Sequence, residues 1–345
     1  MRPVSVFSLA AALGAIALLP ACAGNSPGSS SLVPSSAPSQ QESLHSGARV
    51  RPLGTCTDER RDRSRITHGQ SENPAKAVPY LYVADQCEPS VDVLNSKTYY
   101  ELGSITNGVS EPYDVFVDLK GNLYEADGNG YVNEYSRGSW SAPSFTYSAN
   151  TAYPFAVTVD DHGNVYEGDD GNGYVNEYYQ EQNGATVSSC QPFGGEGAVK
   201  GVAVDNQSDV FVQGFTYAYS DSNELVEYPG GLNSCASPTI LLPLGTAAGG
   251  IALDKNRNLL IANGTNVEVV DAPSYSTVSG TIGSGFCYAT TVRLNKANTL
   301  AFVADDCNDT VTVVNYPGGT NAAVLGTGEG LIEPYAAVSV PNAVY

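Results

Sequence analysis

A twelve-residue string is written almost twice in this chain. It reads YEADGNGYVNEY from Tyr124 and, with one extra residue, YEGDDGNGYVNEY from Tyr166, so the two copies begin 42 residues apart. A repeat of about 40–45 residues is typical of a propeller blade, which is one small antiparallel sheet. The repeat therefore predicts the architecture before any single residue is interpreted.

Five segments read as the first strand of such a repeat. They end at Asp118, Asp160, Asp205, Asp254 and Asn295, with spacings of 42, 45, 49 and 41 residues. Each is followed by a turn rich in Gly, Asn or charged residues, as a tight hairpin requires, and then by an apolar second strand. A third strand and a weaker fourth strand complete each repeat.

The two ends of the repeat region complement each other. Leu81–Asp85 and Val91–Asn95 read as second and third strands without a first strand, whereas Pro334–Pro341 reads as a first strand with nothing after it. Because unpaired sheet edges are unfavourable, we expect the C-terminal segment to complete the first blade, in one of two registers that differ by one residue. The expected fold is all-β: a six-bladed β-propeller over residues 78–345.

Individual repeats resemble known propeller families. LYVAD with VDVLN resembles a YVTN-type repeat, and PYDVFVDLKGNLYEAD and PFAVTVDDHGNVYEGD resemble NHL repeats. This resemblance covers residues 78–345 and implies the propeller fold. It implies no particular activity, because propellers of this kind serve as enzymes, binding modules and scaffolds.

The N-terminal part has the composition of an export signal and a linker. Residues 1–21 carry a charged start and a short apolar run, and the sequence LPAC ending at Cys22 resembles a bacterial lipobox. We therefore expect an exported protein with a lipid anchor on Cys22, the alternative being an ordinary signal peptide. Residues 22–77 are rich in Ser and Pro and read as a disordered tether.

Charge excludes one class of partner. The chain has a formal net charge of −20, and from Val78 onward it contains 8 Lys or Arg against 31 Asp or Glu. Such a surface repels phosphate backbones, so nucleic-acid binding is not expected.

Seven cysteines are present, and six remain if Cys22 carries lipid. An exported protein with an even number of cysteines is expected to form disulfides. The order of the blades suggests three pairs: Cys56–Cys87, Cys190–Cys235 and Cys287–Cys307.

The first strands begin with aromatic or basic residues. The set is Tyr113, Phe155, Lys200, Tyr288 and Tyr335. In a propeller these positions surround the mouth of the central channel, where the resemblance places ligands. The residues are candidates for ligand binding, and the alternative is that they cap the core.

The second strands end in carboxylates and one amide at the same mouth. The set is Asp85, Asp127, Asp169, Asn263 and Asp305. Oxygen ligands gathered near one axis suit calcium, so these residues are candidate metal ligands. The alternative is that Asp and Asn before Gly serve only the turns.

Acidic residues also occupy the middle of the second and third strands. The alignment pairs Glu125 with Glu134, Glu167 with Glu177, and Gln213 with Glu227 as neighbours across two strands. We expect partly buried, mainly structural groups with Tyr hydroxyls or backbone groups as partners. A bridging cation, exposure to solvent and a catalytic pair are the alternatives.

Catalysis by a histidine base is not expected. His45 and His68 fall in the tether, and His162 falls in a hairpin turn away from the mouth. The sequence therefore favours a non-catalytic, monomeric binding or scaffold module of the cell envelope, with a protein or glycan as partner and the lipid anchor as its membrane contact. The alternative is a calcium-dependent hydrolase or lactonase with the metal in the channel.

Overall fold

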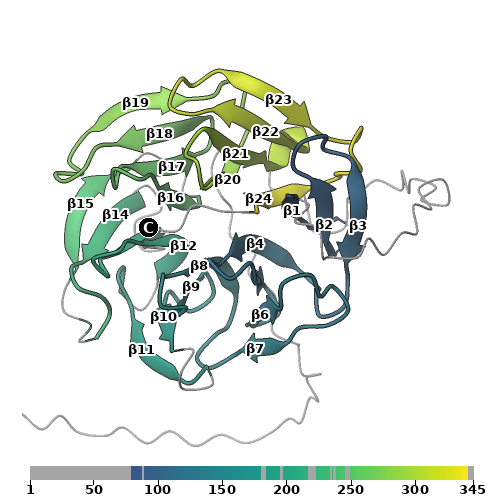
Figure 1. Ribbon diagram of the computed structural model, residues 1–345. Helices are drawn as coiled ribbons and strands as arrows, with labels where there is room; N and C mark the ends of the chain where they lie inside the picture. The colour runs from purple at the N-terminus through teal and green to yellow at the C-terminus, as the bar shows by residue number, and fades with distance from the viewer. Residues whose placement is uncertain are drawn as a thin grey trace, which may run out of the picture. The chain divides into compact units, whose positions relative to one another are not determined.

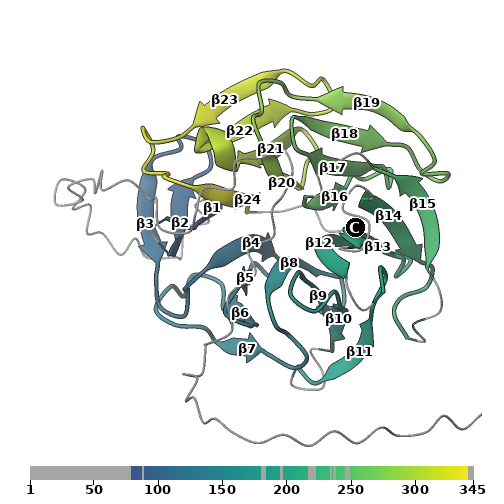
Figure 2. The same ribbon diagram turned by 180° about the vertical axis from the view of Figure 1, so that it is seen from behind.

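The computed structural model describes residues 79–340 apart from residues 88, 180–183, 195–196, 217–222, 234, 236–237 and 245–248. Six four-stranded antiparallel sheets are arranged in a ring (Figures 1 and 2). The prediction of an all-β, six-bladed β-propeller is thus confirmed. The predicted signal peptide, the tether and the lipidated Cys22 lie outside the described residues.

In each blade the first strand lies nearest the ring axis and the second strand pairs with it (Figure 1). The first strands of blades 1 to 6 are β24 (Pro334–Ser339), β4 (Pro112–Val117), β8 (Pro154–Val159), β12 (Gly197–Val204), β16 (Ile251–Leu253) and β20 (Ala289–Leu294). The second strands are β1 (Tyr80–Asp85), β5 (Leu123–Asp127), β9 (Val165–Asp169), β13 (Val210–Thr216), β17 (Leu259–Asn263) and β21 (Leu300–Asp305).

The third and fourth strands lie progressively farther out. The third strands are β2 (Ser90–Asn95), β6 (Tyr131–Tyr135), β10 (Val175–Tyr178), β14 (Asn223–Tyr228), β18 (Asn266–Val270) and β22 (Thr310–Asn315). The fourth strands are β3 (Glu101–Ile105), β7 (Phe145–Tyr147), β11 (Thr186–Cys190), β15 (Thr239–Pro243), β19 (Val278–Ile282) and β23 (Asn321–Leu325). We call the end where first strands begin and second strands finish the loop face, and the opposite end the hairpin face.

The C-terminal strand closes the ring. β24 pairs with β1, and Ala84 faces Ala336 while Asp85 faces Pro334. This is the register with which β4 pairs with β5, so the closing strand is a full equivalent of the other first strands. β24 thereby covers the edge of β1 that would otherwise be open to pairing with another chain.

The core consists of six apolar clusters, one in each seam between neighbouring blades. The period-2 alternation of each strand turns one set of side chains toward each neighbouring blade, and both sets are therefore apolar. In the closing seam, for example, Phe302 and Val313 of blade 6 pack with Leu81, Val83 and Ala337 of blade 1.

Two of the predicted disulfides are present. Cys190 at the end of β11 is bonded to Cys235 in blade 4, and Cys287 is bonded to Cys307 within blade 6. Cys87 is disulfide-bonded as well; Cys56, its predicted partner, lies outside the described residues. Disulfides indicate an oxidising compartment such as the periplasm or the extracellular space. In the described part of the chain we find no helix with the length and hydropathy needed to span a bilayer.

Candidate functional site

The first strands share an irregularity at their loop-face ends. In five blades one residue of the first strand has no partner in the second strand, which produces a β-bulge. Such a bulge bends the strand and redirects a side chain. The bulge residues are Tyr113, Phe155, Lys200, Thr290 and Tyr335. Four of them belong to the set that the sequence predicted for the channel mouth.

Those four side chains meet one another across blades 1 to 4. Tyr113 stacks on Phe155 with 4.8 Å between the ring centroids, and Tyr335 meets both rings edge-on at 5.0 and 5.6 Å. The Lys200 ammonium lies 3.7 Å from the centroid of the Phe155 ring. Tyr153, which the sequence reasoning missed, adds a ring 5.2 Å from that of Tyr113. We call these five residues the mouth cluster.

Carboxylates border the mouth cluster. Glu111 accepts hydrogen bonds from the hydroxyls of Tyr153, at 2.6 Å, and Tyr113, at 2.9 Å, and the two hydroxyls also contact each other. Burial, followed by the neighbouring phenol or carboxylate, raises the pKa of both tyrosines, which are therefore neutral. Asp170 accepts a hydrogen bond from Lys200 at 2.6 Å. The site is thus an aromatic centre with an acidic border.

Two glycines allow the loops of blades 2 and 3 to pack against the cluster. A Cβ atom on Gly128 would lie 2.8 Å from the Tyr113 ring, and one on Gly171 would lie 2.9 Å from Cβ of Tyr153. Distances this short exclude a side chain, so these positions of the repeated string require glycine. The sequence suggested turn geometry or oxygen ligands for this segment, and the close approach was not foreseen.

Blade 6 approaches the site differently. Its bulge residue is Thr290, whose hydroxyl donates to the carbonyl of Tyr335 at 2.7 Å. Tyr288, the predicted mouth residue, directly precedes β20 and is held by its backbone N–H bond to Asp305 at 2.8 Å. Burial, followed by the charges of Asp306 and Asp170, raises the pKa of its hydroxyl. Nearby, burial and Asp306 raise the pKa of Glu333 to about 7.

The aspartates predicted as metal ligands accept hydrogen bonds from backbone N–H groups. Asp127 accepts the backbone N–H groups of Ser110 and Glu111, at 2.6 and 3.3 Å, and so fixes the loop that leads into its own first strand. The same arrangement recurs in three further blades. The remaining aspartates of this type are Asp85, Asp169 and Asp305.

These residues do not fit a shared calcium site. Asp85, Asp127, Asp169 and Asp305 are at most 1% exposed and face N–H donors of their own loops, and Asn263 pairs with Asn266 at the start of β18. Among the described residues, the one group of three acidic or histidine ligand atoms close together is Asp160, Asp161 and His162, in a hairpin-face turn. Calcium binding at the mouth stays a prediction that this geometry does not support.

A buried ion pair crosses the channel, and the sequence reasoning missed it. Arg293 on β20 pairs with Asp114 on β4 and also donates to the carbonyls of Ile251, at 2.7 Å, and Val157, at 3.1 Å. Arg293 and Asp114 are 3% and 1% exposed. Four blades are thus joined through one guanidinium. No spacing in the sequence pairs these two residues, which are 179 positions apart.

The predicted cross-strand pairs of acids are wrong by one position. Glu125 faces Asn133, and Glu134 faces Tyr124. A shift of one residue moves a side chain to the other face of its sheet. Glu125 lies fully buried in the seam toward blade 1, where its Oε2 accepts from Asn133 at 3.0 Å and its Oε1 has no partner among the described residues. Glu134 instead accepts from the hydroxyl of Tyr147 at 2.9 Å.

Blade 3 repeats this arrangement and blade 4 does not. Glu167 is fully buried and accepts from Asn176 at 2.6 Å, while Glu177 accepts from the hydroxyl of Tyr166 at 2.9 Å. The register assigns the equivalent pair in blade 4 to Val212 and Val226, so the predicted role of Gln213 is also wrong by one position. The tyrosine partners expected for this group of acids are present for Glu134 and Glu177.

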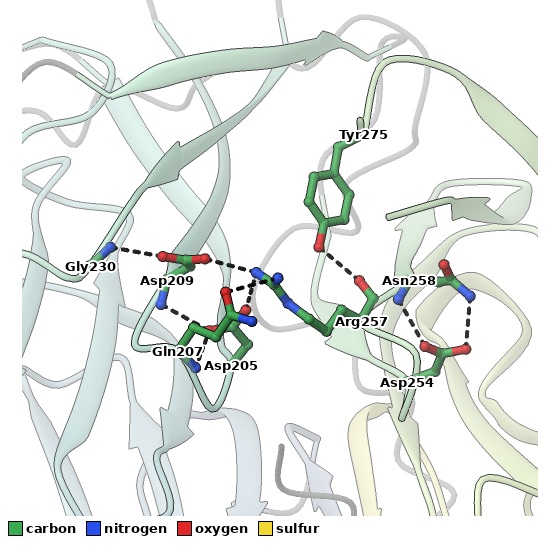
Figure 3. A network of polar contacts seen from close by, with 8 residues as sticks. All are labelled: Asp205, Gln207, Asp209, Gly230, Asp254, Arg257, Asn258 and Tyr275. Carbon is green, nitrogen blue, oxygen red and sulfur yellow. Dashed lines mark hydrogen bonds and ion pairs between the residues drawn. The ribbon is translucent and has the colours of Figure 1, made fainter. Parts of the chain in front are cut away.

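The hairpin face carries a polar network between blades 4 and 5 (Figure 3). Arg257, in the turn between β16 and β17, forms ion pairs with Asp205 and Asp209 and donates to Gln207 at 3.1 Å. Burial alone would lower the pKa of Arg257, but the two carboxylates raise it. The hydroxyl of Tyr275 donates to the Arg257 carbonyl at 3.0 Å. The network joins two turns of the protein to each other.

Comparisons with known proteins identify the fold. No family model matches the sequence, and no curated protein matches it significantly. A chain from a crystal structure of a nidogen–laminin complex superposes with a TM-score of 0.59 at 12% identity, over 76% of this chain and 98% of that one. A protein of unknown function from Bacteroides caccae gives a TM-score of 0.58 at 12% identity, with the same coverage. The chain is therefore similar to known β-propellers in fold alone.

Proposed function

We propose that this protein is a non-catalytic binding or scaffold module that recognises a cell-envelope protein or glycan through its loop face. The observation that carries the proposal is the set of bulges that gathers Tyr113, Phe155, Lys200 and Tyr335 from four blades. Aromatic side chains that converge from separate elements are enriched at the centres of interaction sites.

The proposed setting is an exported lipoprotein. The apolar N-terminal run, Cys22 in a lipobox-like sequence and the Ser- and Pro-rich linker support this setting, as do the NHL- and YVTN-like repeats. The disulfides support an oxidising compartment. An anchored propeller on a linker would present its rigid disc to partners in the envelope.

The side chains inside the channel favour a binding role over hydrolysis. Arg293 and Asp114 occupy its interior, and the aspartates at its mouth accept backbone N–H groups. His162, the one histidine among the described residues, lies on the hairpin face. The neighbour from the nidogen–laminin complex indicates that a chain of this shape occurs in a protein–protein assembly.

Site-specific photo-crosslinking tests the proposed face. A photoreactive amino acid is placed at the exposed loop-face positions Asn129 and Thr327, and at the exposed hairpin-face positions Lys120 and Ala297, in the full chain expressed in its source organism. Illumination is expected to give discrete adducts from Asn129 and Thr327 only, detected by electrophoresis and mass spectrometry. Adducts confined to the hairpin face, or equal on both faces, would contradict the proposal.

A further inference from the structure

The two faces of the propeller differ in their basic residues. Eight Lys or Arg follow residue 78, and six of them lie in turns of the hairpin face. These six are Lys97, Lys120, Arg137, Lys255, Arg257 and Lys296. Arg293 lies inside the channel, so Lys200 is the one basic residue at the loop-face end of the described chain.

Acidic side chains gather where the basic ones are absent. Glu111, Asp170, Asp306 and Glu333 are partly exposed on the loop face. The charges of Asp170 and Asp306 both act on the phenols of Tyr288 and Tyr335, although these acids belong to blades 3 and 6. Glu111 accepts from the hydroxyls of Tyr113 and Tyr153, and Asp170 accepts from Lys200, so these acids border the aromatic centre and contribute a negative potential at this face.

Lys200 shows which chemistry this centre stabilises. Its ammonium lies on the Phe155 ring and within 2.6 Å of Asp170, and the residue is 9% exposed. A cation over an aromatic face with a carboxylate beside it is a favourable arrangement. The chain thus already holds one ammonium in the mouth, with further rings and carboxylates next to it.

We propose that the acidic border of the mouth cluster, together with its two partly exposed rings, Tyr153 and Tyr335, binds a basic segment of a protein partner. Tyr113 and Phe155, which are 7% and 6% exposed, support these rings from below. This inference rests on the proposed function and adds the chemical class of the partner. Charge complementarity is the argument: the face is acidic, the ring faces attract cations, and an anionic or phosphorylated ligand would be repelled.

Peptide titration tests this class. The probe is N-acetyl-tetralysine amide, with the same peptide acetylated on every side chain as the neutral control, titrated calorimetrically at about 20 mM salt, where screening is weak. The basic peptide is expected to bind and the acetylated one is not. Asp306→Asn is expected to weaken binding by about threefold, whereas Asp161→Asn, the same charge change at an exposed hairpin-face position, leaves it unchanged.

Replacing Lys200 gives the sharper result. Lys200→Met removes the internal ammonium while Asp170 and the Phe155 ring stay in place, so the basic peptide is expected to bind about fivefold more tightly. An anionic ligand would respond in the opposite direction. Lys296→Met on the hairpin face is the matched control, and unfolding curves establish that each variant is folded. If the Lys200 variant does not fold, the comparison of Asp306→Asn with Asp161→Asn decides alone.

The proposal is overturned if the acetylated peptide binds as tightly as the basic one, if Asp161→Asn weakens binding as much as Asp306→Asn, or if Lys200→Met weakens it. Crosslinks that persist on the loop face without any binding of the basic peptide would reject the cationic class and leave the binding face intact. Absence of both would reject the proposed function as well.

Discussion

The two faces of the propeller use aspartate in different ways. On the hairpin face Asp160 accepts the backbone N–H groups of His162 and Asn164, two and four residues away. On the loop face Asp169 accepts those of Ala152 and Tyr153, 17 and 16 residues away. The first arrangement shapes one turn, whereas the second connects a strand end to the loop that enters its blade. Asp169 also accepts the N–H groups of Gly171 and Asn172, so the loop-face aspartate adds a long-range contact to a local one, whereas Asp160 contacts only its own hairpin.

Two contacts extend the long-range role to the whole ring. Asp85 accepts the N–H groups of Ile332 and Glu333, 247 and 248 residues away, and so ties the closing strand to the first blade. Arg293 joins blade 6 to three other blades through Asp114 and two carbonyls. If the distinction between local and long-range contacts is correct, these positions are the most sensitive to substitution.

The largest loss of stability is expected from Arg293→Met. The substitution leaves the carboxylate of Asp114 buried without its cation and removes two bonds to carbonyls, so the free energy of unfolding should fall by about 3–5 kcal/mol. Lys296→Met, at an exposed position of the hairpin face, should change it by less than about 0.5 kcal/mol. Chemical unfolding measures both.

A double variant separates the charge from the packing. Asp114→Leu combined with Arg293→Met removes both members of the pair, and it should recover much of the stability lost in the single variant, because apolar groups can replace a buried ion pair. Asp114 also accepts the buried N–H groups of Val115, at 2.9 Å, and Val157, at 3.0 Å. A double variant as unstable as Arg293→Met alone would therefore show that the lost bonds to backbone groups, and not the unpaired charge, account for the loss.

Asp85→Ala tests the comparison between the faces directly. It leaves two N–H groups of the closing loop without their acceptor, so we expect a loss of about 2–3 kcal/mol and faster proteolysis near the C-terminus. Asp160→Ala removes contacts that are confined to its own hairpin, residues 160–166, and should cost about 1 kcal/mol. Equal losses of unfolding free energy in the two variants would mean that the sequence separation between an aspartate and its N–H donors does not affect stability.

Local rules account for the part of the structure that could be predicted. The hairpin turns after Asp118 and Asp160 and the alternation of apolar residues identified the blades, and the unpaired ends predicted closure by β24. The first-strand starts also identified Tyr113 and Phe155, because each blade repeats the same geometry. The alternation of apolar and polar residues does not determine the register of the third strand. The predicted register was wrong by one residue, and it therefore placed Glu134 on the same face of the sheet as Glu125.

Turn motifs and apolar alternation could not predict the contacts that cross the ring. No spacing in the sequence brings Arg293 to Asp114, 179 residues away, or shows that the N–H groups near Asp127 would take up the oxygens expected for calcium. Each depends on how six sheets close into a circle. The bulges belong to the same class, because one extra residue in a strand is visible only after both strands are paired.

The smallest effect is expected at Glu125, which lies in a seam between blades and not at either face. Burial and then Asp127 raise the pKa of Glu125 well above 4.5, so the folded chain holds this proton more tightly than the unfolded chain does. The free energy of unfolding therefore falls as the pH rises from about 4.5 toward that raised pKa. Glu125→Gln keeps the shape and the acceptor for Asn133 but removes the titration.

We therefore expect Glu125→Gln to match the parent chain near pH 4 and to exceed its stability by about 1 kcal/mol at pH 8, with a flatter dependence on pH. Glu167→Gln should behave in the same way, because blade 3 repeats the contact with Asn176. Asp161→Asn, at an exposed position, is the control. If both glutamine variants lose stability at pH 8, the buried carboxylates are ionised and contribute to the seams as charged groups. Blades 2 and 3 would then each hold a buried charge at the position where blade 4 has the apolar pair Val212 and Val226.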